Sequence, residues 1–178
     1  VWHAGVHART VIDSLEAAGF AIRSQIIWAK PRFVLGRADY HQQFEAMLYG
    51  WKAGAQHYWC GARDQGNVWH FDKPARNDLH PTMKPVALVE RAIRNSSKPR
   101  DTVLDCFGGS GTTMIAAERT GRRAVLLEID SAYADVIVRR WQETTGEAAV
   151  LEDDDRIFAD VAAARGIVDH DVIAAAES

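Results

Sequence analysis

Hydrophobic residues change their spacing twice within the first 51 residues of the chain. They recur with helical periodicity over residues 10–20 (TVIDSLEAAGF), which predicts an amphipathic helix. Residues 21–29 (AIRSQIIWA) alternate as a strand does, and Pro31 is expected to end that strand. Residues 44–51 (FEAMLYGW) form a second apolar run, and the opening VWHAG has the pattern of a strand end. This part of the chain therefore predicts a helix followed by an antiparallel pair of strands.

In the second half of the chain, helix and strand patterns alternate. An amphipathic helix is predicted over residues 86–95, a strand over 102–104 and a helix over 113–120. A buried strand follows over 123–129, and a further helix over 132–144. Strands that alternate with helices in this way predict a parallel sheet, so the fold class is α/β.

Two segments show neither helical nor strand periodicity, and the charged residues are distributed unevenly along the chain. Residues 32–43 form a polar loop with aromatic side chains, and residues 53–79 combine Gly, Trp, His and charged residues as an inserted surface segment does. Residues 1–146 carry 19 Lys and Arg against 15 Asp and Glu, whereas residues 147–178 carry 2 against 9. We therefore expect a mildly basic core over 1–146 and an acidic tail over 147–178, with one short strand at 148–151.

Composition argues against several classes of protein. No apolar run approaches the roughly 20 residues that span a bilayer, so no membrane partner is expected. Cys60 and Cys106 do not make a disulfide framework, which favours a reduced, intracellular setting. His57 and Cys60 form one His-x-x-Cys pair without a second pair, so a structural zinc site, which takes four ligands, is not expected.

The strongest candidate for chemistry is the glycine-rich stretch DCFGGSGTT at residues 105–113. A phosphate-binding P-loop requires a Gly-Lys pair, which this stretch lacks. A dinucleotide fingerprint counted from Gly109 fails at Met114, where its third glycine should stand. S-adenosylmethionine has no phosphates, and Glu128, at the end of the next predicted strand, suits its two ribose hydroxyls because a carboxylate accepts both hydrogen bonds.

Three ordered motifs, DCFGGSGTT, HPTMKP and LLEID, resemble those of the DNA amino-methyltransferases, which methylate N6 of adenine or N4 of cytosine. More narrowly they resemble the permuted β group, in which the cofactor loop follows the catalytic motif. The resemblance covers about residues 1–146 and departs from the commoner HPTQKP only at Met83. It implies a Rossmann-like methyltransferase sheet, mostly parallel with one antiparallel strand pair and incomplete in this chain. It also implies S-adenosyl-L-methionine as cofactor.

By this resemblance, the cofactor would be held by the glycine loop, the end of the following strand and the HPTMKP segment. The glycine loop would line its methionine end, Glu128 its ribose and the next two residues its adenine. Lys84 would approach its carboxylate. Asp105 either faces the ligand or caps the backbone amides of the loop. The implied cofactor residues are Asp105, Phe107, Gly108, Gly109, Ser110, Gly111, Thr112, Thr113, Glu128, Ile129, Asp130, His80, Thr82 and Lys84.

The catalytic motif of that family, [D/N/S]-P-P-[Y/F/W], is absent, because none of the five prolines is adjacent to another. In the permuted group it would lie before Val1, so no catalytic residue is assigned and the chain alone is expected not to methylate DNA. An exposed sheet edge left by missing strands would favour self-association. The alternative is a non-catalytic cofactor- or DNA-binding module.

The expected partner is double-stranded DNA, with adenine N6 preferred over cytosine N4, in the cytoplasm of a bacterium or phage-infected cell and in a restriction-modification setting. Residues 53–79 are the candidate target-recognition insert, and residues 32–43 are a second candidate. Tryptophans of the insert, such as Trp59 and Trp69, either contact DNA or pack beneath the loop. The candidate DNA-binding residues are Arg37, Tyr40, Gln42, Arg63, Lys73 and Arg76.

Overall fold

A computed structural model describes residues 1–37, 39–72 and 83–166. The chain divides into two compact units, which are considered separately. The first comprises Val1–Lys73 with Asn95–Ser97, and the second comprises Pro74–Arg94 with Lys98–Ser178.

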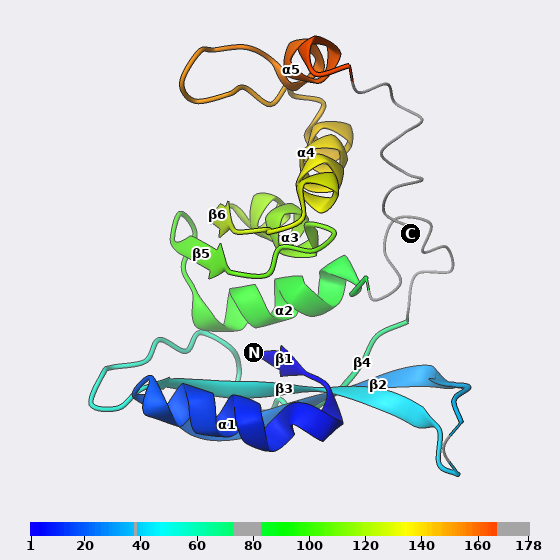
Figure 1. Ribbon diagram of the computed structural model, residues 1–178. Coiled ribbons are helices and arrows are strands. Elements are labelled where there is room, and N and C mark those ends of the chain that lie inside the picture. Colours follow the sequence, from blue (N-terminus) through cyan, green and yellow to red (C-terminus); the bar gives the residue numbers. More distant parts are fainter. Residues whose placement is uncertain (38, 73–82, 167–178) are drawn as a thin grey trace. The chain divides into compact units, whose positions relative to one another are not determined.

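The first unit contains a four-stranded sheet with the strand order β1-β3-β2-β4 (Figure 1). Strands β1 and β2 both pair antiparallel with β3, whereas β4 pairs parallel with β2. Helix α1 packs against β2. The elements are β1 (Trp2–His3), η1 (Gly5–His7), α1 (Ala8–Ala17), β2 (Phe20–Val34), β3 (Gln42–Lys52) and β4 (Val68–His70).

The centre of this sheet is built on buried apolar side chains from its two long strands. Trp28 of β2 and Ala46 and Leu48 of β3 are buried, as the period-2 pattern of these strands requires. The indole N–H of Trp28 donates to the carbonyl of Phe71 at 2.9 Å, so the segment that follows β4 is tied to the same core. The predicted antiparallel pairing of the two strands is confirmed.

The prediction that Pro31 ends its strand is wrong, because β2 continues to Val34. Between the partners Ala29↔Phe44 and Val34↔Gln42 the register shifts, so four residues of β2 face one residue of β3. Proline has no N–H to donate to a ladder, and a bulge is one of the few places in a strand that tolerates it. The strand is therefore interrupted in its pairing and continues past the proline.

Residues 53–79 were expected to lack regular structure, and this expectation is also wrong for part of the segment. Val68–His70 form β4, and the Asn67 side chain donates to the carbonyl of Gln25 at 2.9 Å. Trp69 is buried, so of the two roles considered for this residue it takes the packing role. A three-residue strand is too short to show a hydrophobic period in the sequence. Whether it forms depends on the strand that it pairs with.

The second unit places helices on a pair of parallel strands, β5 and β6, that are joined through α3. Its core includes Ile93, Ala116 and Ala117, with Val103 and Ala124 of the strands packed against them. The elements are α2 (Val86–Ser96), β5 (Thr102–Asp105), α3 (Thr112–Thr120), β6 (Arg123–Leu126), α4 (Ser131–Thr145) and α5 (Phe158–Ala164).

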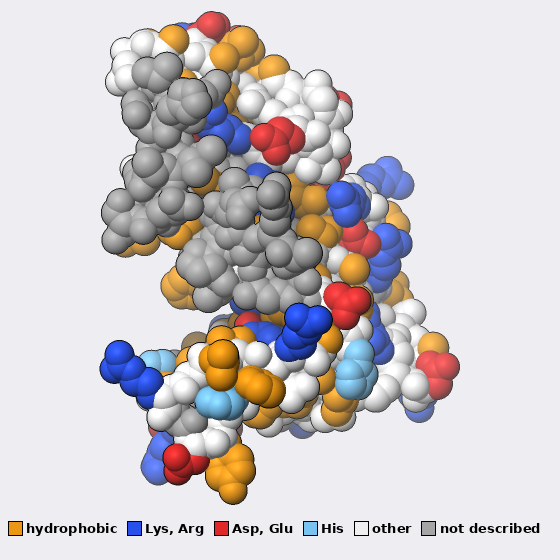
Figure 2. All heavy atoms as spheres, turned by 90° about the vertical axis from the view of Figure 1, so that its right-hand side faces the viewer, with side chains coloured by type: hydrophobic (Ala, Val, Ile, Leu, Met, Phe, Trp, Pro, Cys, Tyr) orange, Lys and Arg blue, Asp and Glu red, His pale blue; other side chains and the backbone are white. Residues whose placement is uncertain are grey.

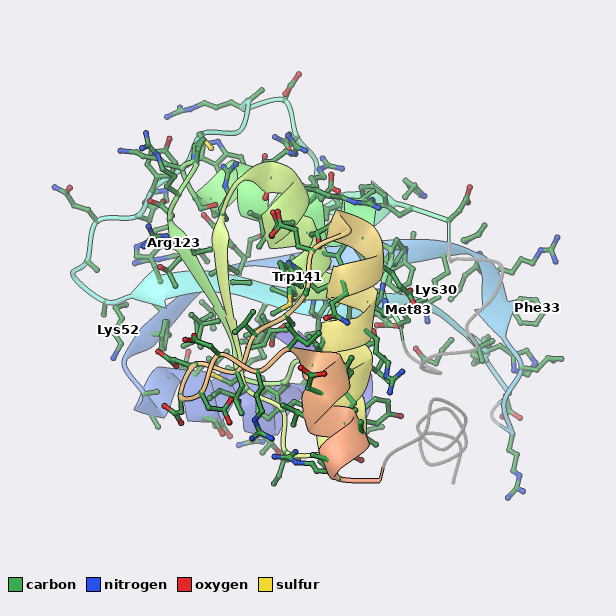
Figure 3. All side chains as sticks on the ribbon, turned by 90° about the horizontal axis from the view of Figure 1, so that it is seen from above. Lys30, Phe33, Lys52, Met83, Arg123 and Trp141 are labelled. Carbon is green, nitrogen blue, oxygen red and sulfur yellow. The ribbon has the colours of Figure 1, made fainter. Side chains whose placement is uncertain are left out.

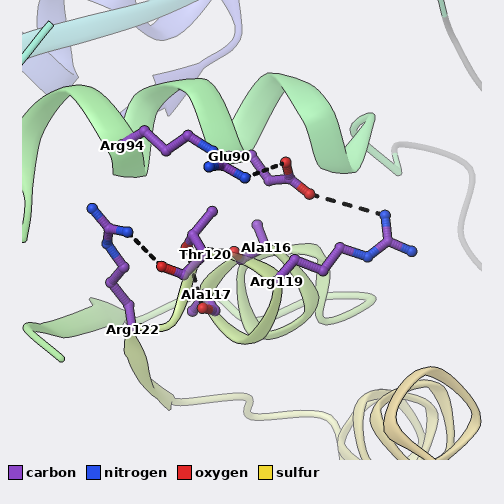
Figure 4. Close-up of polar contacts among 7 residues, drawn as sticks. All are labelled: Glu90, Arg94, Ala116, Ala117, Arg119, Thr120 and Arg122. Carbon is purple, nitrogen blue, oxygen red and sulfur yellow. Dashed lines mark hydrogen bonds and ion pairs between the residues drawn. The ribbon is translucent and has the colours of Figure 1, made fainter. Parts of the chain in front are cut away.

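Charged side chains connect α2 and α3 (Figure 4). Glu90 accepts from Arg94 at 3.3 Å and lies 3.9 Å from the guanidinium of Arg119. Both arginines are about half exposed, so each pair contributes little to stability. The packing of α3 against β6 depends instead on the buried alanines, whose small side chains allow close approach.

The helices and strands of this unit follow the predicted alternation with two differences. Strand β6 ends at Leu126 and not at Ile129, and the backbone of Leu127 hydrogen-bonds with Asp105 and Gly108 at the start of the glycine loop. In the acidic tail, the predicted strand at 148–151 is only an isolated bridge between Val150 and Ile157, and helix α5 follows it. None of the helices within the described ranges reaches the length and apolarity that a bilayer crossing needs.

Candidate cofactor site

The glycine loop connects the carboxyl end of β5 to the first turn of α3. The parallel pairing continues past both strands, since Leu127 donates to the carbonyl of Asp105 and Gly108 donates to the carbonyl of Leu127, each at 2.9 Å. Gly111 then donates to the carbonyl of Gly108 at 2.9 Å and closes a turn before the helix begins at Thr112. The loop is therefore anchored at its start, its middle and its end.

Two glycines of the loop pack closely against Ile137 of helix α4. A Cβ at Gly108 would lie 2.9 Å from Cδ1 of Ile137, and a Cβ at Gly111 would lie 3.0 Å from Cγ2 of the same residue. Gly111 also has φ +76°, in the left-handed region that glycine tolerates best. The glycine-rich sequence thus reflects close packing of α4 as well as the turn itself.

Arg140, one helical turn after Ile137 on α4, donates from its guanidinium to the carbonyl of Ser110. Burial lowers the pKa of Arg140, and the nearby carboxylate of Glu143 opposes that shift. Neither Ile137 nor Arg140 was identified from the sequence, because the spacing of a helix does not tell which loop its buried face will meet.

Glu128 reaches across to the glycine loop from the segment that follows β6. Its Oε2 accepts the N–H of Gly109 at 2.6 Å, and its Oε1 accepts the N–H of Asp130 at 3.1 Å. Asp130 in turn caps α4 by accepting the N–H of Ala132 at 2.8 Å. An ionised carboxylate has about four lone-pair sites, so Glu128 retains acceptor capacity for a ligand beside these two bonds.

Asp105 ends β5 and binds both sides of the loop. Its Oδ1 accepts the N–H of Phe107 at 3.1 Å, and its Oδ2 accepts the hydroxyl of Thr113 at 2.6 Å. Of the two roles considered from the sequence, this geometry is the capping role. The carboxylate fixes the start of the loop to the first turn of the following helix.

Replacing Asp105 with alanine is expected to lower the free energy of unfolding by about 2 kcal/mol, because two hydrogen bonds to a half-buried carboxylate are removed. Urea denaturation followed by circular dichroism measures this change. Asp105→Asn keeps one acceptor oxygen, so about half of the loss is expected. A change within about 0.5 kcal/mol for Asp105→Ala, the range of ordinary surface substitutions, would contradict the capping role.

The structure brings most of the predicted cofactor residues together around this loop. Ser110 and Thr112 are buried, with their hydroxyls 3.4 Å apart, and the Thr112 hydroxyl lies 3.5 Å from the carbonyl of Lys84. Phe107 and Ile129, by contrast, are exposed. His80 and Thr82 of the HPTMKP segment lie outside the described residues.

The candidate DNA-binding residues lie in the first unit, apart from those that the structure does not describe. Arg37 and Tyr40 are exposed in the connection between β2 and β3, and Gln42 is the first residue of β3. Arg63 is exposed in the segment after β3. Lys73 and Arg76 lie outside the described residues. Within the described ranges, no three His, Cys, Asp or Glu side chains group as metal ligands.

A glycine loop at the carboxyl end of one parallel strand, with a carboxylate from the end of the next strand across it, is the arrangement of Rossmann-like proteins that bind nucleosides. Within that class the chain belongs to the N6/N4 DNA methylase family, since the sequence model of that family, described as DNA methylase, matches residues 3–139. S-adenosylmethionine is the cofactor of this family.

Individual relatives agree with this family. The chain is 31% identical over 141 residues to the type II methyltransferase M.Cfr9I of Citrobacter freundii, which covers 72% of this chain and 47% of M.Cfr9I. It is 44% identical over 79 residues to the DNA adenine methyltransferase YhdJ of Escherichia coli strain K12, which covers 42% of this chain and 27% of YhdJ. The chain thus spans about half or less of the length of these curated relatives.

The fold is shared with a solved methyltransferase structure. The crystal structure of the M1.HpyAVI–SAM complex superposes with a TM-score of 0.70 and 27% sequence identity, covering 79% of this chain and 72% of that chain. The predicted α/β methyltransferase fold is confirmed by this similarity. Its sheet was expected to be mostly parallel with one antiparallel pair, whereas the described strands make two antiparallel pairings, β1–β3 and β2–β3, and two parallel ones.

Proposed function

We propose that this chain binds S-adenosylmethionine through the glycine loop and is the cofactor-binding part of a DNA amino-methyltransferase. Adenine N6 is the proposed acceptor, because YhdJ, named a DNA adenine methyltransferase, is 44% identical over 79 residues. The order of the motifs, with HPTMKP before the glycine loop, supports membership of the permuted β group. A bacterial cytoplasmic, restriction-modification setting is proposed with it, since the relative M.Cfr9I is a type II methyltransferase of the bacterium Citrobacter freundii.

The observation that carries this proposal is the acidic border of the glycine loop. Asp105 binds the loop at its start, Glu128 binds the amide of Gly109, and Asp130 follows at the start of α4. Three carboxylates disfavour a phosphate ligand, which is an anion and would have to displace Glu128 from that amide. They favour a ligand that carries positive charge and offers hydroxyl donors, as the sulfonium and the ribose of S-adenosylmethionine do.

The residues at the loop then divide by the part of the ligand that they would hold. Glu128 would accept hydrogen bonds from the ribose hydroxyls, with Ile129 and Asp130 beside the adenine. Phe107 would line the methionine part with its exposed side chain, and Gly109 would let the backbone approach the ligand closely because glycine has no side chain. Lys84 would neutralise the carboxylate of the ligand, and its main chain already lies against Thr112.

S-adenosylmethionine supplies an electrophilic methyl group, which the exocyclic nitrogen attacks while the carbon–sulfur bond breaks and the nitrogen loses a proton. In that reaction the residues of this chain bind and orient the donor. No Pro-Pro-aromatic motif, which would hold the target amine, occurs in the sequence, so we propose that the chain alone transfers no methyl group. That same absence supports the second candidate, a non-catalytic module that binds the cofactor or DNA.

Isothermal titration calorimetry with S-adenosylmethionine, ATP and NAD tests the cofactor assignment directly. We expect heat of binding for S-adenosylmethionine alone, with weak affinity, and no binding of the two phosphate-bearing nucleotides. Preferential binding of ATP or NAD would overturn the assignment. Transfer of a radioactive methyl group to mixed-sequence DNA by this chain would overturn the proposal that the chain holds only the cofactor part.

We also propose that exposed residues of the first unit contact DNA and that the edges of its sheet allow self-association. Arg37, Tyr40, Gln42 and Arg63 are exposed, as groove contacts must be. Strands β1 and β4 lie at the two edges of the first unit's sheet in the part of the chain that the structure describes. Both edge strands are short, which limits the surface that a second copy could pair with.

A further inference from the structure

The strands β2 and β3 extend beyond the core of the first unit and expose large apolar side chains at their far end. Trp28 is 1% exposed, yet Phe33, five residues further along the same strand, is 53% exposed. Leu35 and Tyr40, in the connection between the strands, are 80% and 91% exposed. Figure 3 shows Phe33 at the outer end of this strand pair. We call the described residues 32–37 and 39–44 the hairpin tip.

The bulge at Pro31 separates the hairpin tip from the sheet. Here the side chain of Gln43 donates to the carbonyl of Lys30 at 3.2 Å and replaces a missing ladder bond. The side chain of Lys30, within the bulge, forms an ion pair with Glu45 at 2.7 Å. Bulges bend a strand and increase its twist, so the tip is aimed away from the plane of the sheet.

Contacts within the hairpin tip hold it in a defined shape. The rings of Phe33 and His41 stack with centroids 5.1 Å apart and planes 19° apart. The N–H of Gly36 donates to Nδ1 of His41 at 3.3 Å. These contacts hold the backbone on either side of Leu35 and Tyr40, which reduces the conformational entropy that would be lost when these residues bind a partner.

Basic side chains accompany these apolar ones. Arg32 and Arg37 are both exposed at the hairpin tip, against one exposed carboxylate, Asp39, among its described residues. Figure 2, viewed from the side to which the hairpin points, shows hydrophobic, histidine and basic side chains close together on this part of the first unit. An exposed group of large apolar residues marks an interaction surface. Guanidinium groups beside aromatic side chains favour nucleic acid as the partner, because its phosphates are anionic and its bases stack on aromatic rings.

We infer that the hairpin tip is a wedge that enters duplex DNA, with Leu35 or Tyr40 inserted between base pairs and Arg32 and Arg37 on the flanking phosphates. The inference rests on the proposed function, in which the substrate is duplex DNA. A two-stranded ribbon fits the width of a DNA groove, and apolar wedges unstack base steps in other DNA-bending proteins. An enzyme that modifies a base must extrude it from the stack, and a wedge fills the space that the base leaves.

The test uses fluorescence anisotropy with a labelled duplex of mixed sequence and the same duplex carrying one central mismatch. A mismatch lowers the cost of unstacking, so the unmodified chain should bind the mismatched duplex more tightly. In Leu35→Ser/Tyr40→Ser that preference should disappear and affinity should fall about tenfold, while the dependence on salt stays unchanged. In Arg32→Ala/Arg37→Ala the slope of log affinity against log salt should fall by about 0.9 for each phosphate that the protein no longer neutralises.

Val6→Ser is the matched control, because Val6 is an 89% exposed apolar residue outside the hairpin tip. It should bind both duplexes as the unmodified chain does. Equal affinity and mismatch preference in the Leu35/Tyr40 variant would overturn the wedge, as would failure of the unmodified chain to bind DNA at low salt. A dimer that dissociates in that variant, seen by sedimentation, would also overturn it and identify a second copy as the partner. Calorimetry with S-adenosylmethionine on the same samples reports the cofactor proposal separately.

Discussion

Replacing Glu128 with alanine is expected to reduce the affinity for S-adenosylmethionine about a hundredfold. Glu128 holds the amides of Gly109 and Asp130 in the structure, and in the proposed complex it also accepts the ribose hydroxyls. Hydrogen bonds to a charged acceptor contribute about 1.5–3 kcal/mol each, so losing two of them removes about 3 kcal/mol or more. Calorimetric titration should show binding that falls below detection.

Two further variants make this result specific to the position of Glu128. Glu147→Ala removes an exposed carboxylate that follows α4, so it should leave the affinity unchanged while changing the net charge by the same amount. Glu128→Gln keeps the length of the side chain but cannot accept from both ribose hydroxyls, so an intermediate loss is expected. If Glu128→Ala bound S-adenosylmethionine with unchanged affinity, the proposal that Glu128 binds the ribose would be wrong.

Replacing Gly111 with alanine is expected to destabilise the fold by about 3 kcal/mol. An alanine at φ +76° costs about 1 kcal/mol, and its Cβ would lie 3.0 Å from Cγ2 and 3.2 Å from Cα of Ile137. The Cα belongs to the backbone of α4, so the helix itself must shift, at an additional cost of about 1–3 kcal/mol. Urea denaturation measures the change in unfolding free energy.

Gly146→Ala is a closely matched comparison. Gly146 ends α4 with φ +75°, almost the same backbone conformation, but a Cβ there would have nothing within 4 Å. It should therefore lose only about 1 kcal/mol, the cost of the left-handed conformation. Equal losses in the two variants would show that the packing of Ile137 against the loop contributes nothing. A larger loss at Gly111 would show that α4 shapes the cofactor loop.

Most regular elements could be predicted from the sequence because their signals are local. Helix α4 was expected over 132–144 and spans Ser131–Thr145, since amphipathic spacing and Asp130 as N-cap both lie within the segment itself. Strand β4 could not be predicted, because three residues form a strand only when β2 offers its free edge. The strand past Pro31 was missed for a related reason, since a bulge depends on the partner strand.

The sequence by itself determined which ligand chemistry the second unit can serve. What decided it was the type of residue at particular positions, which the sequence states directly. These features are the lack of a Gly-Lys pair, Met114 in place of a third glycine, and Glu128 at the end of the next predicted strand. Only the tertiary structure decided how that loop is held and what the hairpin tip exposes. Ile137 and Arg140 meet the loop because of how α4 packs, and Leu35 and Tyr40 are exposed because the connection between β2 and β3 lies beyond the buried part of these strands. Such contacts join residues distant in sequence, and the local spacing of hydrophobic residues carries no information about them.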